Sequence, residues 1–429
     1  MPVLTNKTGQ TSLSMNNNKY KKNILISPLH WGTGHATRIQ ALARELRKKG
    51  HRIIIASPPS LHKIFDSSVY DELTGIWSPP VHYPRFLPLY LGVLVQLPLL
   101  FAAFLYDSCM SRVLIRRYDI DILISDNRFG MRGRKVYSIF VTHQPRVIVP
   151  APFAFAGSAV SAIHRWVASG YDECWIPDLP GAANLSGLLS HECKLPPATR
   201  YIGILSRFSP EAMDTHPCTV NAAETGRPGS GSTHPFTLAI MSGPEPQRSI
   251  LEKIIISQKD KMPGELVIVA GSPGERTGDT AEGVTRHAWL DGQSLRRLMC
   301  DASFIICRPG YSTIMDLFAL GRTACLVPTP GQPEQEYLAG YLASGYGFAG
   351  ISQSELPAVS TADINTIRGT EIRKEPVNSA DGEGSEPAGT KGETPGGTAE
   401  ENTDWNAESR MLMEKALDGL FRKQPSSAT

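Results

Sequence analysis

The amino-acid sequence predicts an α/β protein with two similar domains that face each other across a cleft, each built on a parallel β-sheet. The chain has 429 residues, which is more than one hydrophobic core usually organises. Short apolar runs rich in β-branched residues alternate with helical patterns in the N-terminal half. A stretch rich in Pro, Gly, Ser and Thr interrupts this alternation at 209–235, and the same alternation begins again after it.

The first domain is expected over 21–208. Residues 23–27 (NILIS) predict a strand, and 36–49 carry apolar residues three and four positions apart before Gly50, which predicts a helix that ends there. Residues 51–56 (HRIIIA) predict a second strand and complete a β-α-β unit. Further strands are expected at 119–125, 146–150, 173–177 and 200–205.

The second domain is expected over 236–353, after a linker at 209–235. Its strands are expected at 236–241, 265–270, 286–290, 303–307 and 323–327. Its helices are expected near 246–260, 294–300, 311–320 and 334–344. Both domains therefore have a Rossmann-like order of elements.

The two ends of the chain depart from this pattern. Residues 1–20 are polar and rich in Asn, Thr and Ser, which predicts a disordered tail rather than a secretory signal. Residues 354–402 are rich in Glu, Gly, Thr and Pro, and they predict a disordered segment. The apolar spacing within 403–429 predicts a terminal helix, followed by a tail, that packs back onto the body.

The overall composition disfavours several classes of protein. Charged residues make up 20% of the chain and the formal net charge is +2, which does not favour a nucleic-acid binder. The seven cysteines are scattered, with no C-x-x-C pair and no His at metal-ligand spacing. We therefore expect reduced thiols, a cytoplasmic location and no metal site.

An almost uncharged segment at 87–106 (LPLYLGVLVQLPLLFAAFLY) is about as long as a membrane span. Pro88 and Pro98 interrupt it and Gln96 lies in its middle, which weighs against a span. Three interpretations stay open. The first is that the segment forms a buried pair of helices. The second is that it forms an apolar surface that rests on the inner face of the membrane, and the third is that it spans the membrane.

Parallel sheets bind ligands at the carboxyl ends of their strands, so the loops that follow strands carry the candidate site. The loop at 28–38 (PLHWGTGHATR) runs directly into a helix, and Gly32 and Gly34 permit close backbone approach to an anion or an oxygen. Thr37 replaces the third glycine of a dinucleotide fingerprint, no acid follows the second strand, and the chain has no P-loop motif. A dinucleotide site and a P-loop nucleotide site are therefore not expected.

Two residues are candidates for a catalytic base. His35 stands at the helix start, and an imidazole suits removal of a proton from a sugar hydroxyl at neutral pH. Asp126 follows an apolar strand, where it either supports His35 or is itself the base. The alternatives are a His35 that only caps the helix and an Asp126 that only forms a turn. We call the molecule whose hydroxyl would lose its proton the acceptor. The residues expected to contact it are Gly32, Thr33, Gly34, Asn127, Arg128, His143 and Gln144.

The strongest pattern lies in the second domain at 308–316 (RPGYSTIMD), where a buried type of strand turns into a helix. Gly310 permits the tight turn, the residues after it offer hydroxyls and free amides to a diphosphate, and Arg308 supplies positive charge. Asp316 lies where it can accept hydrogen bonds from ribose hydroxyls. The alternative is a capped helix that only packs. The donor-site candidates from these motifs are Ser242, Gly243, Arg308, Gly310, Tyr311, Ser312, Thr313 and Asp316.

These motifs resemble those of GT-B glycosyltransferases that use nucleotide-sugar donors. They are similar in particular to the family that adds N-acetylglucosamine to the lipid-linked peptidoglycan precursor, and to related bacterial glycosyltransferases. That family has a basic residue, then Gly two positions on, Ser or Thr at the fifth position and an acidic ribose ligand at the eighth. Arg308, Gly310, Thr313 and Asp316 occupy these places, with Asp316 in place of the commoner glutamate.

Other segments extend this resemblance over 23–350. The Gly32 to His35 loop is similar to the family's Gly-Thr-Gly-Gly-His loop with one glycine fewer, and His143-Gln144 resembles an acceptor element. In the second domain, Glu334 and Gln335 resemble the cluster that holds the donor sugar. The segment 286–291, which contains Leu290, resembles the one whose backbone reads the uracil edge.

The resemblance implies a GT-B fold and transfer of a hexose or N-acetylhexosamine from a UDP-sugar to an acceptor hydroxyl, with inversion and without a metal ion. It implies a glycan or lipid-linked acceptor and no cofactor apart from the UDP-sugar co-substrate. Two other functions stay open. One is a sugar-nucleotide epimerase or hydrolase of the same fold, and the other is a non-catalytic protein that binds nucleotide sugars.

Overall fold

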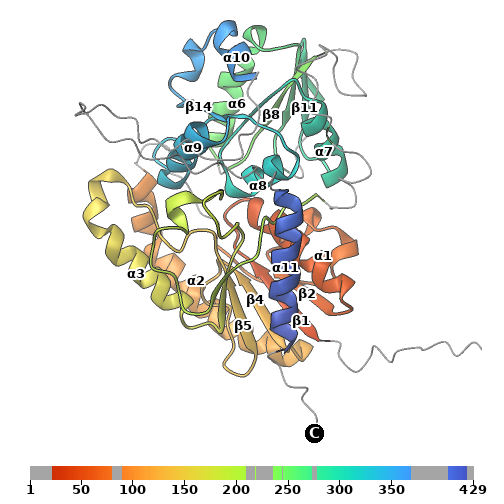
Figure 1. Cartoon of the computed structure of the whole chain (residues 1–429), viewed down its shortest axis with the longest axis vertical. Coiled ribbons are helices and arrows are strands. Elements are labelled where there is room, and N and C mark those ends of the chain that lie inside the picture. Colours follow the sequence, from red (N-terminus) through yellow and green to blue (C-terminus); the bar gives the residue numbers. More distant parts are fainter. Residues whose placement is uncertain are drawn as a thin grey trace, which may run out of the picture.

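The computed structural model describes residues 22–79, 89–208, 218, 235–243, 245–272, 278–368 and 404–422. It contains two α/β domains, each with a seven-stranded sheet, stacked one above the other (Figure 1). The fold class predicted from the sequence is thereby confirmed. The tail predicted at 1–20, most of the linker predicted at 209–235 and the stretch 369–402 lie outside the described residues.

The N-terminal sheet is parallel throughout, in the strand order β3-β2-β1-β4-β5-β6-β7. This order places β1, β4 and β5 side by side, so the loops after them open at the same edge. The strands are β1 (Asn23–Pro28), β2 (Arg52–Ser57), β3 (Glu72–Gly75), β4 (Ile122–Asp126), β5 (Tyr137–Val141), β6 (Glu173–Ile176) and β7 (Thr199–Tyr201). The helices are α1 (Gly34–Lys48), α2 (Leu89–Tyr118) and α3 (Gly157–Ala168).

The C-terminal sheet has the order β10-β11-β9-β8-β12-β13-β14 and is parallel except where β10 pairs with β11. Its central strands β8 and β12 are fully buried, as their apolar runs predict. The strands are β8 (Phe236–Ile240), β9 (Glu265–Val269), β10 (Gly278–Ala281), β11 (Val284–His287), β12 (Phe304–Cys307), β13 (Cys325–Leu326) and β14 (Ala349–Gly350). The helices are α6 (Gln247–Ser257), α7 (Gly292–Asp301), α8 (Tyr311–Ala319), α9 (Pro333–Gly345) and α10 (Thr361–Arg368).

The strand predicted at 146–150 is wrong. The place beside β4 belongs to β5, whose residues Tyr137–Val141 pair with Ile122–Asp126 in parallel register. Residues 146–150 join no ladder, and the amide of Val147 instead donates to Ser161 Oγ at 3.1 Å. Residues 137–141 and 146–150 both contain strand-forming residues. Which of the two joins the sheet depends on pairing with a strand that is distant in sequence, so local propensity does not decide it.

The disorder predicted for 354–402 is wrong for its first part. A short 3₁₀ turn at Leu356–Ala358 and helix α10 follow β14, and Leu356 and Ile364 are buried in the core of the second domain. Burial of these apolar side chains offsets the loss of conformational entropy when this segment becomes ordered. The prediction failed because it averaged them with the polar stretch that follows.

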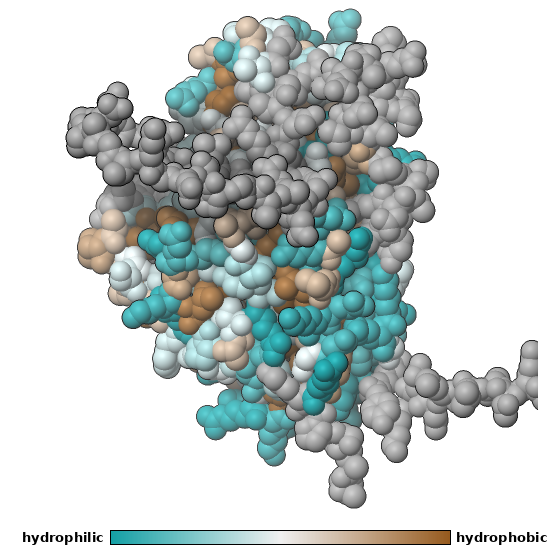
Figure 2. Space-filling view, viewed as in Figure 1, coloured by the Kyte–Doolittle hydropathy of each residue, from teal (hydrophilic) through white to brown (hydrophobic). Residues whose placement is uncertain are grey.

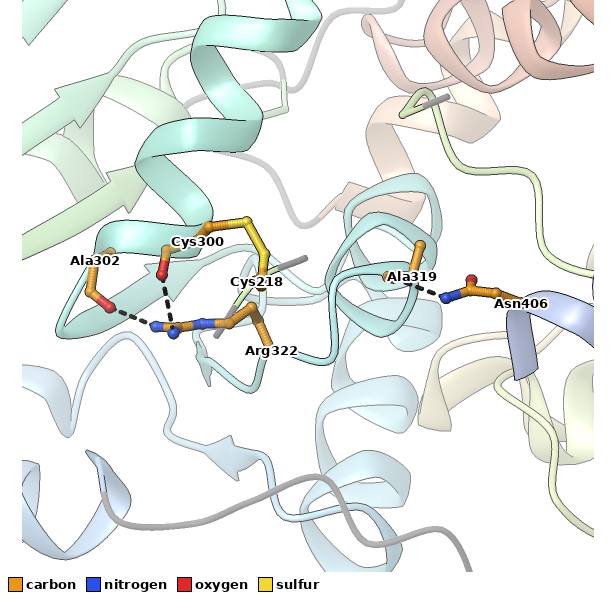
Figure 3. The surroundings of a disulfide bond; sticks show 6 residues. All are labelled: Cys218, Cys300, Ala302, Ala319, Arg322 and Asn406. Carbon is orange, nitrogen blue, oxygen red and sulfur yellow. Dashed lines mark hydrogen bonds between the residues drawn. A yellow bond between two sulfur atoms is a disulfide. The ribbon is translucent and has the colours of Figure 1, made fainter. Parts of the chain in front are cut away.

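The expectation of seven reduced thiols is wrong for one pair. Cys218, in the predicted linker, forms a disulfide with Cys300 near the end of α7, with a Cα–Cα distance of 5.1 Å (Figure 3). The side chain of Arg322 donates to the carbonyl oxygens of Cys300 and Ala302 beside it. The disulfide therefore ties the chain between the domains to the C-terminal one. The other five cysteines are free.

The terminal helix α11 (Trp405–Arg422) packs back onto the body, as its apolar spacing predicts, and it contacts both domains. Trp405 packs against Phe318 of α8, with ring centroids 5.2 Å apart. Further along, Ser409 Oγ accepts from the amide of Ile204 at 3.0 Å, so the helix runs down the side of the N-terminal domain (Figure 1). Asn406 also donates to the carbonyl oxygen of Ala319 at 3.1 Å, which satisfies the end of α8 (Figure 3).

Residues 89–106 belong to one long helix, α2, which continues through Pro98, and not to a buried pair of helices. The second half of α2 packs on the sheet, where Leu114 and Tyr118 join Leu25 in a core cluster. Among the described residues, Val95–Tyr118 is the one helical stretch that is long and apolar enough to cross a membrane.

Candidate functional site

The first turns of α1 and α8 meet where the two domains face each other. Ser312 Oγ donates to the carbonyl oxygen of Gly34 at 2.9 Å. Neither helix has a side-chain cap or an acidic residue in its first turn. The positive φ of Gly32, 94°, allows the loop after β1 to turn into α1. Two helix N-termini without side-chain caps therefore meet between the domains, and the positive ends of both helix dipoles favour an anion there.

The loops after β1, β4 and β5 bring a chain of ionisable side chains to the same edge. His35 Nδ1 lies 3.0 Å from Asp126 Oδ2, and Arg38 Nε donates to the same oxygen at 2.9 Å. The Nη2 atom of Arg38 also contacts Asp126 Oδ1. Because Nδ1 donates to the carboxylate, His35 Nε2 is the nitrogen that is left to accept a proton. The sequence suggested His35 and Asp126 but not Arg38, which lies one turn further along α1.

The electrostatics make His35 the base of the pair. Burial opposes ionisation of Asp126, but the charges of Arg38 and His35 and their hydrogen bonds lower its pKa to about 2. Burial also lowers the pKa of His35 below 6.5, and Arg38 adds to this, whereas Asp126 opposes it. At neutral pH His35 is therefore neutral and Asp126 is ionised.

The network continues into the C-terminal domain through His143. Arg38 Nη1 donates to His143 Nδ1 at 3.2 Å, so His143 carries its proton on Nε2 and donates to Glu334 Oε1 at 2.8 Å. Tyr311 stacks on His143 with centroids 4.2 Å apart, and its hydroxyl donates to the carbonyl oxygen of Pro177. Glu334 begins α9, so an expected donor-sugar ligand and an expected acceptor ligand meet directly.

A second polar group lines the edge of the N-terminal sheet beside α2. Arg128 forms an ion pair with Asp107 of α2, with Nη2 to Oδ1 at 2.6 Å, and also donates to the carbonyl oxygen of Trp77. Among the described residues, three buried polar atoms here have no hydrogen-bond partner, namely Asn127 Oδ1, Arg128 Nη1 and His30 Nδ1. Buried polar atoms are rarely left unpaired, so these three atoms are candidates for contact with a bound ligand. Neither Asp107 nor Trp77 lies in a motif that predicts a site residue.

The side chains of two donor-site candidates, Arg308 and Asp316, are buried among partners within the protein. The Arg308 side chain is fully buried and donates to the carbonyl oxygens of residues 247, 327 and 328 and to Gln353. Asp316 accepts from Ser206 Oγ at 2.8 Å and from Arg207 Nε at 2.6 Å. The structure thus places Arg308 behind the turn and Asp316 between the domains.

The remaining candidates lie at the rim of the cleft or support it. Gln335 accepts from the amide of Thr329, Thr313 is buried in the first turn of α8, and Gly243 has a φ of 92°. Leu290 packs against the core directly before α7, and Gln144 follows His143. Ser242 and Thr33 are partly exposed. Within the described part of the chain, no three His, Cys, Asp or Glu side chains are grouped to hold a metal ion.

Comparisons with known proteins agree with this architecture. Residues 292–368, which contain α8 and Glu334, match the glycosyltransferase family 28 C-terminal domain. The fold is similar to that of the glycosyltransferase of kitacinnamycin, with a TM-score of 0.51 and 14% identity over 94% of this chain and 100% of that one. It is also similar to the spinosyn rhamnosyltransferase, with a TM-score of 0.51 and 16% identity over 81% and 92% of the two chains.

The calicheamicin glycosyltransferase is similar at a TM-score of 0.50 and 12% identity, over 93% of this chain and 94% of that one. No curated protein matches the chain. The chain therefore has the GT-B fold, and its residues 292–368 match the family 28 C-terminal domain, while the resemblance to the peptidoglycan enzyme stays a prediction.

The buried pair between Arg207 and Asp316 yields a prediction about stability. Burial raises the pKa of Asp316, and the charge of Arg207 opposes that rise. Arg207→Ala leaves a buried carboxylate without its cation and should lower the free energy of unfolding by about 3 kcal/mol. The measurement is chemical denaturation. Arg207→Ala combined with Asp316→Asn should recover most of the loss, and an equal loss in both variants would show that the ion pair does not hold the domains.

Proposed function

We propose that this chain is a glycosyltransferase that moves a hexose or N-acetylhexosamine from a UDP-sugar to an acceptor hydroxyl, with inversion and without a metal ion. The family 28 match and the GT-B fold support the reaction class. The observation that carries the proposal is the contact between two uncapped helix N-termini, Ser312 to Gly34, one residue from the His35 imidazole. The helix N-termini, which suit a diphosphate, and His35, which suits the role of proton acceptor, thus lie in the same cleft.

The donor diphosphate is proposed to bind at the first turn of α8. Its charge would be balanced by the free amides of Tyr311 and Ser312 and by the Ser312 hydroxyl, once the contact to Gly34 opens. Arg308 is buried behind this turn, where it holds the 327–328 carbonyls, so we assign it the role of shaping the turn. Glu334 and Gln335 begin the adjacent α9 and are proposed to orient the sugar.

The acceptor hydroxyl is proposed to lose its proton to His35. The acceptor oxygen attacks the anomeric carbon, its proton passes to Nε2 of His35, and the bond from that carbon to the diphosphate breaks. The electron pair leaves with the nucleoside diphosphate, where the amides of α8 stabilise the charge. Attack from the side opposite the leaving group inverts the configuration. Asp126, ionised and held by Arg38, orients the imidazole and stabilises its protonated form.

Replacing the proposed base should separate catalysis from donor binding. His35→Gln should lower kcat by about 10²- to 10⁴-fold, since the side chain keeps its polarity but accepts no proton. UDP affinity, measured by isothermal titration, should stay within threefold. His62→Gln, at a histidine that contacts the carbonyl oxygen of Ser57, is the matched control. A parallel loss of UDP binding in His35→Gln would move this residue into the donor site.

The pKa of His35 should determine how kcat/KM depends on pH. Its pKa lies below 6.5, and the base must be unprotonated, so kcat/KM should be flat at neutral pH and fall as pH drops through that lowered pKa. Asp126→Asn removes the charge that opposes this lowering, so the acidic limb should move to still lower pH. An acidic limb centred above pH 6.5 in the wild type would contradict this assignment.

Charge at the start of α8 tests the donor site. Ser312→Asp places a carboxylate at a helix N-terminus, which favours folding of the helix but repels a diphosphate. UDP binding should weaken by about tenfold or more, whereas Ser312→Ala, which loses the hydroxyl and the contact to Gly34 but keeps the helix amides, should weaken it much less. Titration of both variants with UDP makes the comparison, and equal affinities would place the phosphates elsewhere.

The function itself is tested with a set of nucleotide sugars. A thermal-shift screen should find stabilisation by UDP or a UDP-sugar, because a ligand that binds only the folded state raises the midpoint temperature of thermal unfolding. Product analysis of the stabilising donor then separates transfer from hydrolysis and epimerisation. If no nucleotide sugar binds, the proposal fails.

A further inference from the structure

The first half of α2 forms an apolar projection from the N-terminal domain. From Val95 to Leu105 most side chains are exposed, with Val95 at 74% and Phe101 at 63% of their surface accessible. Soluble proteins rarely expose a contiguous apolar surface of this kind without a binding partner. This stretch contains no charged residue.

Both ends of this projection are attached at one place. Tyr106, where the second half of α2 begins to pack, accepts a hydrogen bond from the amide of Trp77 at 3.1 Å, and their rings lie 5.4 Å apart. The chain therefore leaves and returns to the domain at the same point. Because β3 and β4, on either side of this excursion, belong to one sheet, α2 alone does not carry the chain across a bilayer.

A second group of exposed apolar side chains lies on and before α3. Phe155 is 85% exposed, Trp166 75% and Ile163 63%. The loop at 127–136 lies between the two helices, since the backbone of Gly130 approaches Phe104 of α2 while Phe129 packs against His164 of α3. In Figure 2, brown and tan atoms gather at the left edge of the lower domain, where Figure 1 places α3.

Basic side chains border this apolar surface. Residues 127–171 contain six Arg and Lys residues and no Asp or Glu, although the whole chain is nearly neutral. In α2, the charged residues follow the apolar half, and Arg112 lies about 16 Å beyond Phe101 along the helix. The exposed basic residues on α2 and on the loop beside it are Arg112, Arg116, Arg117, Arg132, Arg134 and Lys135.

We propose that this apolar face, formed by α2 and α3 with its basic border, binds the surface of an anionic lipid bilayer. An apolar tip followed by a basic band matches the order of acyl chains and anionic headgroups in a membrane leaflet. A protein partner or a second copy of this chain could pack against the apolar side chains. Neither would explain why the charged side chains of this border are all basic. The face enters one leaflet and does not cross it.

Vesicle sedimentation of the full chain tests the apolar part. The wild type should cosediment with phosphatidylcholine vesicles that contain phosphatidylglycerol, and much less with pure phosphatidylcholine. Phe101→Glu and Trp166→Glu should each weaken partitioning by about tenfold or more. Met411→Glu, at an apolar residue of α11 that is 58% exposed, makes the same charge change and should leave partitioning unaltered.

The basic border is tested by a matched pair of double variants. Arg134→Glu with Lys135→Glu should weaken binding to the anionic vesicles by about thirtyfold and reduce its dependence on salt. Arg410→Glu with Lys415→Glu, at exposed positions of α11, should do neither. The proposal is overturned if the wild type ignores both kinds of vesicle or if Phe101→Glu binds as well as Met411→Glu. It is also overturned if gel filtration shows a lipid-free dimer that Phe101→Glu dissociates, because the face then binds a second copy.

Discussion

The buried carboxylate of Asp126 is the charge on which the arrangement of the cleft depends. An ionised group with no exposed surface is tolerated only with cationic partners, and here Arg38 and His35 supply them from α1. Asp126 ends β4, so these bonds fix α1 over the sheet with its N-terminus open to the other domain. The same arginine holds His143, which in turn holds Glu334 of α9. One buried anion therefore aligns groups from both domains.

The sequence predicts well what depends on local signals. The strand, glycine turn and helix at 304–319 and the loop that ends at His35 are found as expected, because apolar periodicity and turn glycines act over a few residues. Long-range choices are not local. The sequence predicts a strand at 146–150, whereas the strand that pairs with β4 is β5, and the ion pair of Asp316 with Arg207 joins residues more than one hundred positions apart. The burial of Arg308 likewise depends on the carbonyl oxygens of Val327, directly after β13, and of Gln247 in α6.

The partners of Arg308 and Asp316 change the physical account of the donor site. Without a free guanidinium, charge on a diphosphate would be balanced by backbone amides of α8, whose positions are fixed by the helix and cost no reorganisation. The contacts that Ser312 and Asp316 make across the cleft are polar, and Glu334 accepts a hydrogen bond from His143, while α11 packs apolar side chains against both domains.

The ion pair between Arg128 and Asp107 links the acceptor side of the cleft to α2. Arg128 follows Asp126 closely in the loop after β4, and its remaining nitrogen, Nη1, is buried without a partner. Asp107 lies one residue beyond Tyr106, where the exposed part of α2 is attached. A bilayer that held the first half of α2 would therefore also constrain the arginine beside the proposed base. This arrangement favours an acceptor that approaches from the membrane surface.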